Sequence, residues 1–190
     1  MTHTFLTSKA VSPPEPGSPH IILVGLPGAG KSTVGRLLGE TLKRAFLDFD
    51  AEIEQRVGMS VAAIFAERGE AGFRRLERQL TEDVARLGNM VLAPGGGWVS
   101  DPAVVGLVRP PGVVVYLRTR PEQAVRRLGP GAGGRPLLNR PGALQELARL
   151  YESRRLAYES ADVEVATELL TPQQVAAEVA ARLAGRLGAL

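Results

Sequence analysis

Short, mostly apolar runs alternate along the chain with longer segments in which apolar residues recur every three or four positions. The apolar runs cover residues 21–24, 45–50, 90–93, 113–117 and 163–166. Runs of this length are typical of strands buried in a parallel sheet. The periodic segments predict helices over about residues 34–42, 52–57, 61–66, 69–87, 121–128 and 143–158, and a last helix after Pro172. This alternation predicts an α/β fold in which helices cover both faces of a parallel sheet.

Two segments fit neither pattern. Residues 1–19 contain four prolines and little to bury, so we expect a disordered leader before a single domain over residues 20–190. Residues 129–142 are rich in glycine and include Arg135. We predict a mobile lid there, whose closure would bring Arg135 onto phosphate and exclude water. A plain linker is the alternative.

Length and composition narrow the possible functions. A chain of 190 residues suffices for one sizeable core. Cysteine is absent, which excludes disulfides and thiolate metal sites and fits a reducing cytoplasm. No apolar run approaches the roughly 20 residues of a membrane span, so we expect a soluble cytoplasmic protein without a membrane partner. The formal charge of +3 suits anionic small molecules, and no stacking platform points to nucleic acid. We expect a monomer.

The strongest motif follows the first apolar run. Residues 21–33 read IILVGLPGAGKST, and Gly25 to Ser32 have the G-x-x-x-x-G-K-S spacing of a phosphate-binding P-loop. Backbone N–H groups and the positive end of a helix would cradle a di- or triphosphate, Lys31 would reach its terminal phosphates, and Ser32 would bind magnesium. The alternative is a glycine-rich turn with one exposed lysine. The residues expected to bind nucleotide are Gly28, Ala29, Gly30, Lys31, Ser32 and Thr33.

Two carboxylates end the second apolar run. Alternation along a strand would send Asp48 and Asp50 to one side and Phe49 to the other. Ligands gather at the C-terminal ends of parallel strands, so we expect both acids to lie near the P-loop. Asp50 could instead cap the following helix, but capping would account for one acid and not for the pair.

Two later features suit a small substrate that carries a carboxylate. Arg74 and Glu77 lie three residues apart on a predicted helix, so the glutamate can hold the guanidinium ready for bidentate capture. A solvated surface ion pair is the alternative. Gly95, Gly96 and Gly97 follow the third apolar run, where their backbone N–H groups could approach a small polar molecule closely. A plain loop would also account for these glycines.

Taken together, these features resemble the shikimate kinases, P-loop enzymes that transfer the γ-phosphate of ATP to the 3-hydroxyl of shikimate. The resemblance extends from about His20 to the final helix and rests on five ordered motifs, GLPGAGKST, LDFD, GEAGFRRLE, GGG and RPLL. It implies a three-layer α/β/α fold with five parallel strands in the order 2-3-1-4-5. It also implies ATP as co-substrate, Mg²⁺ as cofactor and a place in the pathway to aromatic amino acids.

The same resemblance implies roles on the nucleotide side. Asp48 would help to hold magnesium, through water, together with Ser32. Lys31 and Arg135 would be catalytic, and Arg135 would follow the transferring phosphoryl group from the lid. Arg127 would stack against adenine.

On the acceptor side, the resemblance makes Asp50 the residue that binds the shikimate hydroxyls and orients or deprotonates the attacking one. Arg74 and Arg154 would clamp the substrate carboxylate, with further contacts from Gly95, Gly96 and Gly97. Glu77 would support Arg74.

The chain departs from the family's pattern in three places. Phe49 and Trp98 are bulkier than usual, and we expect neither to reach the ligand edge. The family's R-x-P-L-Y motif reads RRLAY here, where the spacing from Tyr158 selects Arg154 but leaves Arg155 open. Two other functions also stay open, namely a kinase for gluconate or a nucleoside monophosphate, and a nucleotide-binding regulator without catalysis.

Overall fold

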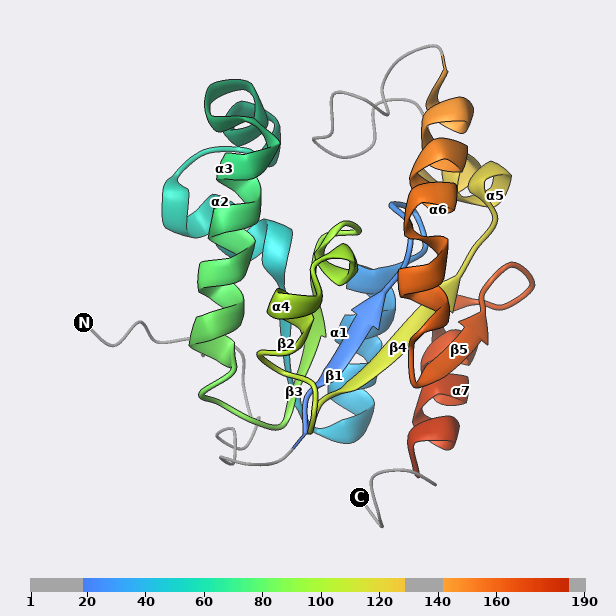
Figure 1. Ribbon diagram of the computed structural model, residues 1–190. Coiled ribbons are helices and arrows are strands. Elements are labelled where there is room, and N and C mark those ends of the chain that lie inside the picture. Colours follow the sequence, from blue (N-terminus) through green and yellow to red (C-terminus); the bar gives the residue numbers. More distant parts are fainter. Residues whose placement is uncertain (1–18, 129–141, 185–190) are drawn as a thin grey trace.

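The computed structural model describes residues 19–128 and 142–184. Within them, five strands form one sheet, and helices lie on both of its faces (Figure 1). The predicted leader and most of the predicted lid, including Arg135, lie outside the described residues, so both remain predictions.

The sheet has the predicted architecture. Every pair of neighbouring strands is parallel, and the order is β2-β3-β1-β4-β5. In this register Ile21 of the central strand lies opposite both Val91 and Val113. The strands are β1 (Ile21–Val24), β2 (Ala45–Asp48), β3 (Met90–Ala93), β4 (Val113–Arg118) and β5 (Val163–Ala166).

Helices cover the sheet in two layers. Alternation along β1 sends Ile21 and Leu23 into a core with α1 and α7, whereas Ile22 and Val24 face the core formed with α2 to α6. Because both faces are covered, all four residues of β1 are buried. The helices are α1 (Lys31–Leu42), α2 (Phe49–Val57), α3 (Val61–Val84), α4 (Pro102–Val105), α5 (Pro121–Leu128), α6 (Ala143–Glu159) and α7 (Pro172–Ala184).

The third helix is interrupted where the sequence predicts. α3 consists of two helical segments that meet at a kink, where Gly69 has the non-helical values φ 65° and ψ −178°. Glycine tolerates this backbone because it has no Cβ. The predicted break between the two segments is therefore confirmed. A 3₁₀ turn over Trp98–Ser100 and the one-turn helix α4 were not predicted.

The chemistry-bearing segments converge at one edge of the sheet. The P-loop follows β1, and the glycine turn follows β3. Asp48 is the last residue of β2, and Asp50 comes just after it. These are the C-terminal ends of three adjacent parallel strands, where α/β proteins bind ligands. None of the described helices is both long and apolar enough to cross a membrane.

Candidate active site

The P-loop connects β1 to α1 as the sequence predicts. Gly28 and Gly30 have φ values of 84° and 97°, in the left-handed region, and Gly30 is the residue that precedes α1. A Cβ atom at Gly28 would lie 2.6 Å from the carbonyl oxygen of Ala124, so only glycine fits there. The positive end of α1 therefore opens directly onto the loop, an arrangement that favours a bound anion.

Lys31 lies folded over this loop. It is the first residue of α1, and its Nζ donates hydrogen bonds to the carbonyl oxygens of Gly25 at 3.0 Å and Leu26 at 3.2 Å. These bonds hold the ammonium group above the P-loop backbone. A compact cation at this point could contact the terminal phosphates of a nucleotide.

A cavity of about 530 Å³ lies over the P-loop, and we call it the donor cavity. Its volume falls in the range of roughly 300–1,000 Å³ found for small-molecule sites. The lining consists of residues 27–34, Asp48, Asp50, Ala93, Pro94, Arg127, Leu128, Thr167, Leu170, Pro172 and Val175.

Asp48 and Asp50 both line the donor cavity, but the strand alternation predicted for them is wrong. β2 ends at Asp48, and Asp50 lies in the first turn of α2. The Asp48 carboxylate caps this helix, since its Oδ1 accepts from the N–H groups of Asp50 at 3.1 Å and Ala51 at 3.4 Å. The capping residue is thus Asp48 and not Asp50. Helix initiation by an N-cap aspartate prevails over strand extension here.

The oxygen atoms of the donor cavity suit magnesium. Ser32, Asp48 and Asp50 contribute a hydroxyl and two carboxylates, which are hard oxygen ligands. Among residues 19–128 and 142–184, no three His, Cys, Asp or Glu side chains form a group that could hold a metal ion alone. Magnesium usually needs only one or two carboxylates, because substrate phosphates and water complete its shell. These residues therefore fit an ion that binds together with a nucleotide.

Arg127 lies in the wall of the donor cavity, where its guanidinium is fixed by the end of β5. Its Nη1 donates to Thr167 Oγ1 at 2.9 Å, and its Nη2 donates to the Thr167 carbonyl oxygen at 2.5 Å. The structure thus brings Arg127 to the nucleotide side, in a position compatible with the predicted stacking on adenine.

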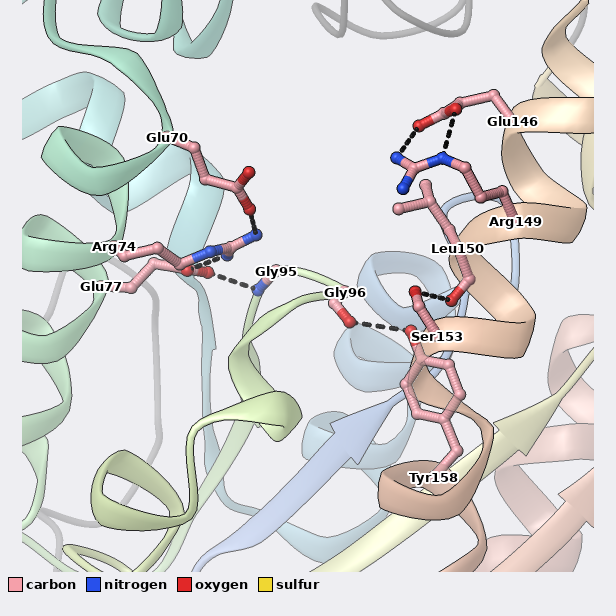
Figure 2. Close-up of polar contacts among 10 residues, drawn as sticks. All are labelled: Glu70, Arg74, Glu77, Gly95, Gly96, Glu146, Arg149, Leu150, Ser153 and Tyr158. Atoms are coloured by element: carbon pink, nitrogen blue, oxygen red, sulfur yellow. Dashed lines mark hydrogen bonds and ion pairs between the residues drawn. The ribbon is translucent and has the colours of Figure 1, made fainter.

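Arg74 lies between two carboxylates on α3 (Figure 2). Its Nη1 donates to Glu77 Oε2, and its Nη2 donates to Glu70 Oε1 at 3.0 Å. The Glu77 side chain is only 2% exposed, so this pair is not a solvated surface pair. Burial lowers the pKa of the Arg74 guanidinium, but Glu77 and Glu70 outweigh burial and raise that pKa above its ordinary value. Arg74 therefore stays charged.

The glycine turn leaves room for these side chains. Gly95 donates its N–H to Glu77 Oε1 at 3.1 Å, and a Cβ atom at Gly95 would collide with the same carboxylate. A Cβ atom at Gly97 would collide with the Arg74 guanidinium. Neither glycine has a positive φ, so the need for glycine here is one of space. The turn therefore packs directly against Arg74 and Glu77.

Helix α6 brings Arg154 to the same turn. Arg154 Nη1 would lie 3.3 Å from a Cβ atom at Gly96, and the Tyr158 hydroxyl donates to the Gly96 carbonyl oxygen at 2.8 Å. Arg155 instead lies near two glutamates of its own helix, Glu152 at 3.8 Å and Glu159 at 3.5 Å. The geometry thus favours Arg154 for a clamp with Arg74.

A second cavity of about 390 Å³, the acceptor cavity, lies between α3 and α6. The expectation that Trp98 stays away from the ligand edge is wrong, because Trp98 lines this cavity, and its Nε1 donates to Thr81 Oγ1 at 2.9 Å. Phe49 is fully buried in the core, as expected. The lining consists of Glu70, Arg74, Glu77, Arg78, Gly97, Trp98, Ser100, Asp101, Val104, Ser153 and Arg154.

Sequence reasoning missed two residues of this region. Glu70 contacts Arg74, and its position four residues earlier on a helix is a signal that could have identified it. Tyr158 served only to align a motif, and no local pattern indicates that its hydroxyl reaches Gly96, 62 residues away.

Comparisons with known proteins agree with this geometry. The family model described as shikimate kinase matches residues 27–184. The shikimate kinase of Chromohalobacter salexigens is 44% identical over 167 residues, which cover 87% of this chain and 92% of the relative. That of Coxiella burnetii is 40% identical over 162 residues, which cover 84% and 90%.

Solved structures give the same result. The shikimate kinase of Acinetobacter baumannii in complex with shikimate has a TM-score of 0.83 at 36% identity, and the match covers 90% of this chain and 97% of that one. The enzyme of Aquifex aeolicus has a TM-score of 0.76 at 34% identity, with 90% and 99% covered. A gluconokinase of Sinorhizobium meliloti, at 20% identity and a TM-score of 0.57 over 90% and 95% of the two chains, shares the fold alone. The chain therefore belongs to the shikimate kinase family.

Proposed function

We propose that this protein transfers the γ-phosphoryl group of ATP to the 3-hydroxyl of shikimate, giving shikimate 3-phosphate and ADP. The observation that carries the proposal is the arrangement of two cavities around one glycine turn. A Cβ atom at Gly96 would lie 3.4 Å from Pro27 of the donor cavity and 3.3 Å from Arg154 of the acceptor cavity. One cavity suits a polyphosphate, and the other suits a small hydroxylated carboxylate.

On the donor side, the P-loop backbone and the end of α1 would bind the phosphates of ATP. Lys31 would contact the β- and γ-phosphates from its place above the loop. Magnesium, held by Ser32 and through water by Asp48, would neutralise charge on the phosphates. Because Asp48 Oδ1 caps α2, its Oδ2 would take the contact with metal-bound water.

On the acceptor side, Arg74 and Arg154 would bind the shikimate carboxylate through charge-assisted hydrogen bonds. Their positions on α3 and α6, on either side of the glycine turn, would orient the ring so that a hydroxyl faces the donor cavity. Asp50 would accept a hydrogen bond from that hydroxyl and take up its proton during attack. Its Oδ1 lies 3.5 Å from the Cβ position of Gly95, next to the turn.

The reaction needs no covalent intermediate. Phosphoryl transfer passes through a loose transition state, so the protein mainly positions the reactants and stabilises charge. Arg127 at adenine and Arg135 at the transferring phosphoryl group are parts of this proposal that derive from the sequence. Monomeric state and cytoplasmic location are also predictions from the sequence.

A steady-state assay with three acceptors tests the proposal. Release of ADP should depend on shikimate and should be absent with gluconate or AMP, and mass spectrometry should detect shikimate 3-phosphate. Failure of shikimate to stimulate ADP release would overturn the proposed function. ATP binding without any turnover would instead favour a nucleotide-binding regulator.

A further inference from the structure

The charges that line the acceptor cavity are balanced. This matters because the proposed substrate, on which the following inference rests, is an anion. A cavity without net positive charge attracts an anion weakly. The charged lining residues are three arginines, Arg74, Arg78 and Arg154, and three carboxylates, Glu70, Glu77 and Asp101.

Two of the three carboxylates are held by backbone donors. Glu77 is buried, and its Oε1 accepts from the N–H of Gly95 at 3.1 Å. Asp101 caps α4, where its Oδ1 accepts from the N–H groups of Ala103 at 3.0 Å and Val104 at 3.3 Å. Movement of either carboxylate would break hydrogen bonds that hold the glycine turn or a helix end.

Glu70 is bound differently. Its side chain is 66% exposed, and its Oε1 accepts from Arg74 Nη2 at 3.0 Å. Its backbone directly follows the kink at Gly69. Figure 2 shows Glu70 and Glu77 reaching the guanidinium from different sides, and Glu70 lines the acceptor cavity. An exposed pair of this kind is weak, so Glu70 is the carboxylate that can leave.

We propose that Glu70 occupies the place of the substrate carboxylate on Arg74 when no substrate is bound, so that shikimate competes with it. An arginine guanidinium has five N–H donors, and bidentate binding of a carboxylate uses two parallel ones. Glu77 and Glu70 each accept from one Nη atom of Arg74, and because Glu77 is fixed, Glu70 is the carboxylate that an incoming anion meets at Nη2. Glu70 thereby sets the affinity of the site for anionic acceptors.

Helix α6 carries a cation on the side that faces Glu70. Figure 2 shows Arg149 of α6 across from Glu70, and Arg149 binds both oxygens of Glu146, at 2.7 and 3.0 Å. Glu146 is the main cause of the raised pKa of Arg149, and the charge of Glu70 adds to it. Once released from Arg74, the exposed Glu70 side chain would lie opposite this Arg149–Glu146 pair.

The test is the binding of shikimate to the whole protein without nucleotide, measured by isothermal titration calorimetry. Glu70→Gln keeps the shape of the side chain but removes its charge, and should tighten shikimate binding by about threefold to tenfold, the effect of one unit charge at a few ångströms in screened surroundings. The methyl ester of shikimate carries no carboxylate charge, so its affinity should not change. Glu67→Gln, which removes a charge from the same helix but from a residue paired with Arg68, should leave both affinities unchanged.

Three results would overturn the inference. Weaker binding of shikimate by Glu70→Gln would mean that Glu70 positions Arg74 for the substrate. An equal gain for shikimate and its ester would mean that the effect does not depend on the substrate carboxylate, and unchanged binding of both would mean that Glu70 does not compete. The proposed function fails separately, if the wild-type protein neither binds nor phosphorylates shikimate.

Discussion

Replacement of Tyr158 by phenylalanine tests how the acceptor site is held together. Tyr158 is fully buried, and its hydroxyl donates a 2.8 Å hydrogen bond to the Gly96 carbonyl oxygen in the turn between the two cavities. Tyr158→Phe leaves this oxygen without that donor, which costs about 1–3 kcal/mol. With a urea dependence of about 2 kcal/mol per molar, the unfolding midpoint should fall by roughly 0.5–1.5 M. The single tryptophan, Trp98, is buried and provides the fluorescence signal.

A neighbouring tyrosine supplies the control. Tyr116 stacks on Tyr158 with ring centroids 5.1 Å apart and 8° between the ring planes, and it is equally buried. Within the described part of the chain, its hydroxyl has no hydrogen-bond partner. Tyr116→Phe should therefore leave stability unchanged or raise it, because an unpaired buried hydroxyl is unfavourable. Equal losses of stability in both variants would refute the reasoning, since they would show that removal of a hydroxyl costs the same with or without a hydrogen-bond partner.

The same pair of variants should differ in kinetics. Tyr158 lies one helical turn after Arg154 on α6, so the bond to Gly96 holds Arg154 against the glycine turn. We expect Tyr158→Phe to raise KM for shikimate severalfold and to leave KM for ATP unchanged. Equal changes in both constants would contradict a role specific to the acceptor cavity.

Other substitutions test the two cavities and the buried His20. Arg154→Ala should raise KM for shikimate by at least about 30-fold, because loss of a hydrogen-bonded charge contact costs about 2–5 kcal/mol. Arg155→Ala should not raise this KM. Similar kinetics of the two variants would contradict the assignment. Lys31→Ala should lower kcat by about 100-fold to 1,000-fold with an unchanged circular dichroism spectrum, and turnover within a factor of two of wild type would contradict a donor role for the P-loop. Burial lowers the pKa of His20 below 6.5, so the unfolded chain binds a proton that the folded chain does not. Thermal stability should therefore be highest above about pH 6.5 and fall as the pH decreases below that value. His20→Gln should weaken this pH dependence. A melting temperature of the wild-type protein that stays constant from pH 8 to about 5.5 would contradict the role of His20.

Much of the fold was predictable because the signals are local. Four apolar residues at Ile21–Val24, followed by glycines with a fixed spacing, specify a buried strand, a phosphate loop and a helix without reference to the rest of the chain. The kink at Gly69 was also visible as an interruption of the helical pattern. The strand order could not be predicted from such local signals. It came from the resemblance to a family and not from periodicity.

Local signals failed where two of them competed. Asp48 and Asp50 suit both the end of a strand and the start of a helix, and the pattern alone could not decide which acid would cap. In the structure the boundary lies at Asp48, whose carboxylate caps α2. Both carboxylates still line the donor cavity, so the prediction that they lie near the P-loop is confirmed, although the predicted alternation is wrong.

By itself, the sequence determined the strands, the P-loop and the helical spacing of Arg74 and Glu77, because those features depend on residues within a few positions of one another. Only the tertiary structure decided how the two cavities are lined, because their walls join distant segments. It placed Arg154, and not Arg155, beside Gly96, brought the Tyr158 hydroxyl to the same turn, and set Trp98 in the cavity wall. It also brought the Gly95 N–H to the Glu77 carboxylate that holds Arg74.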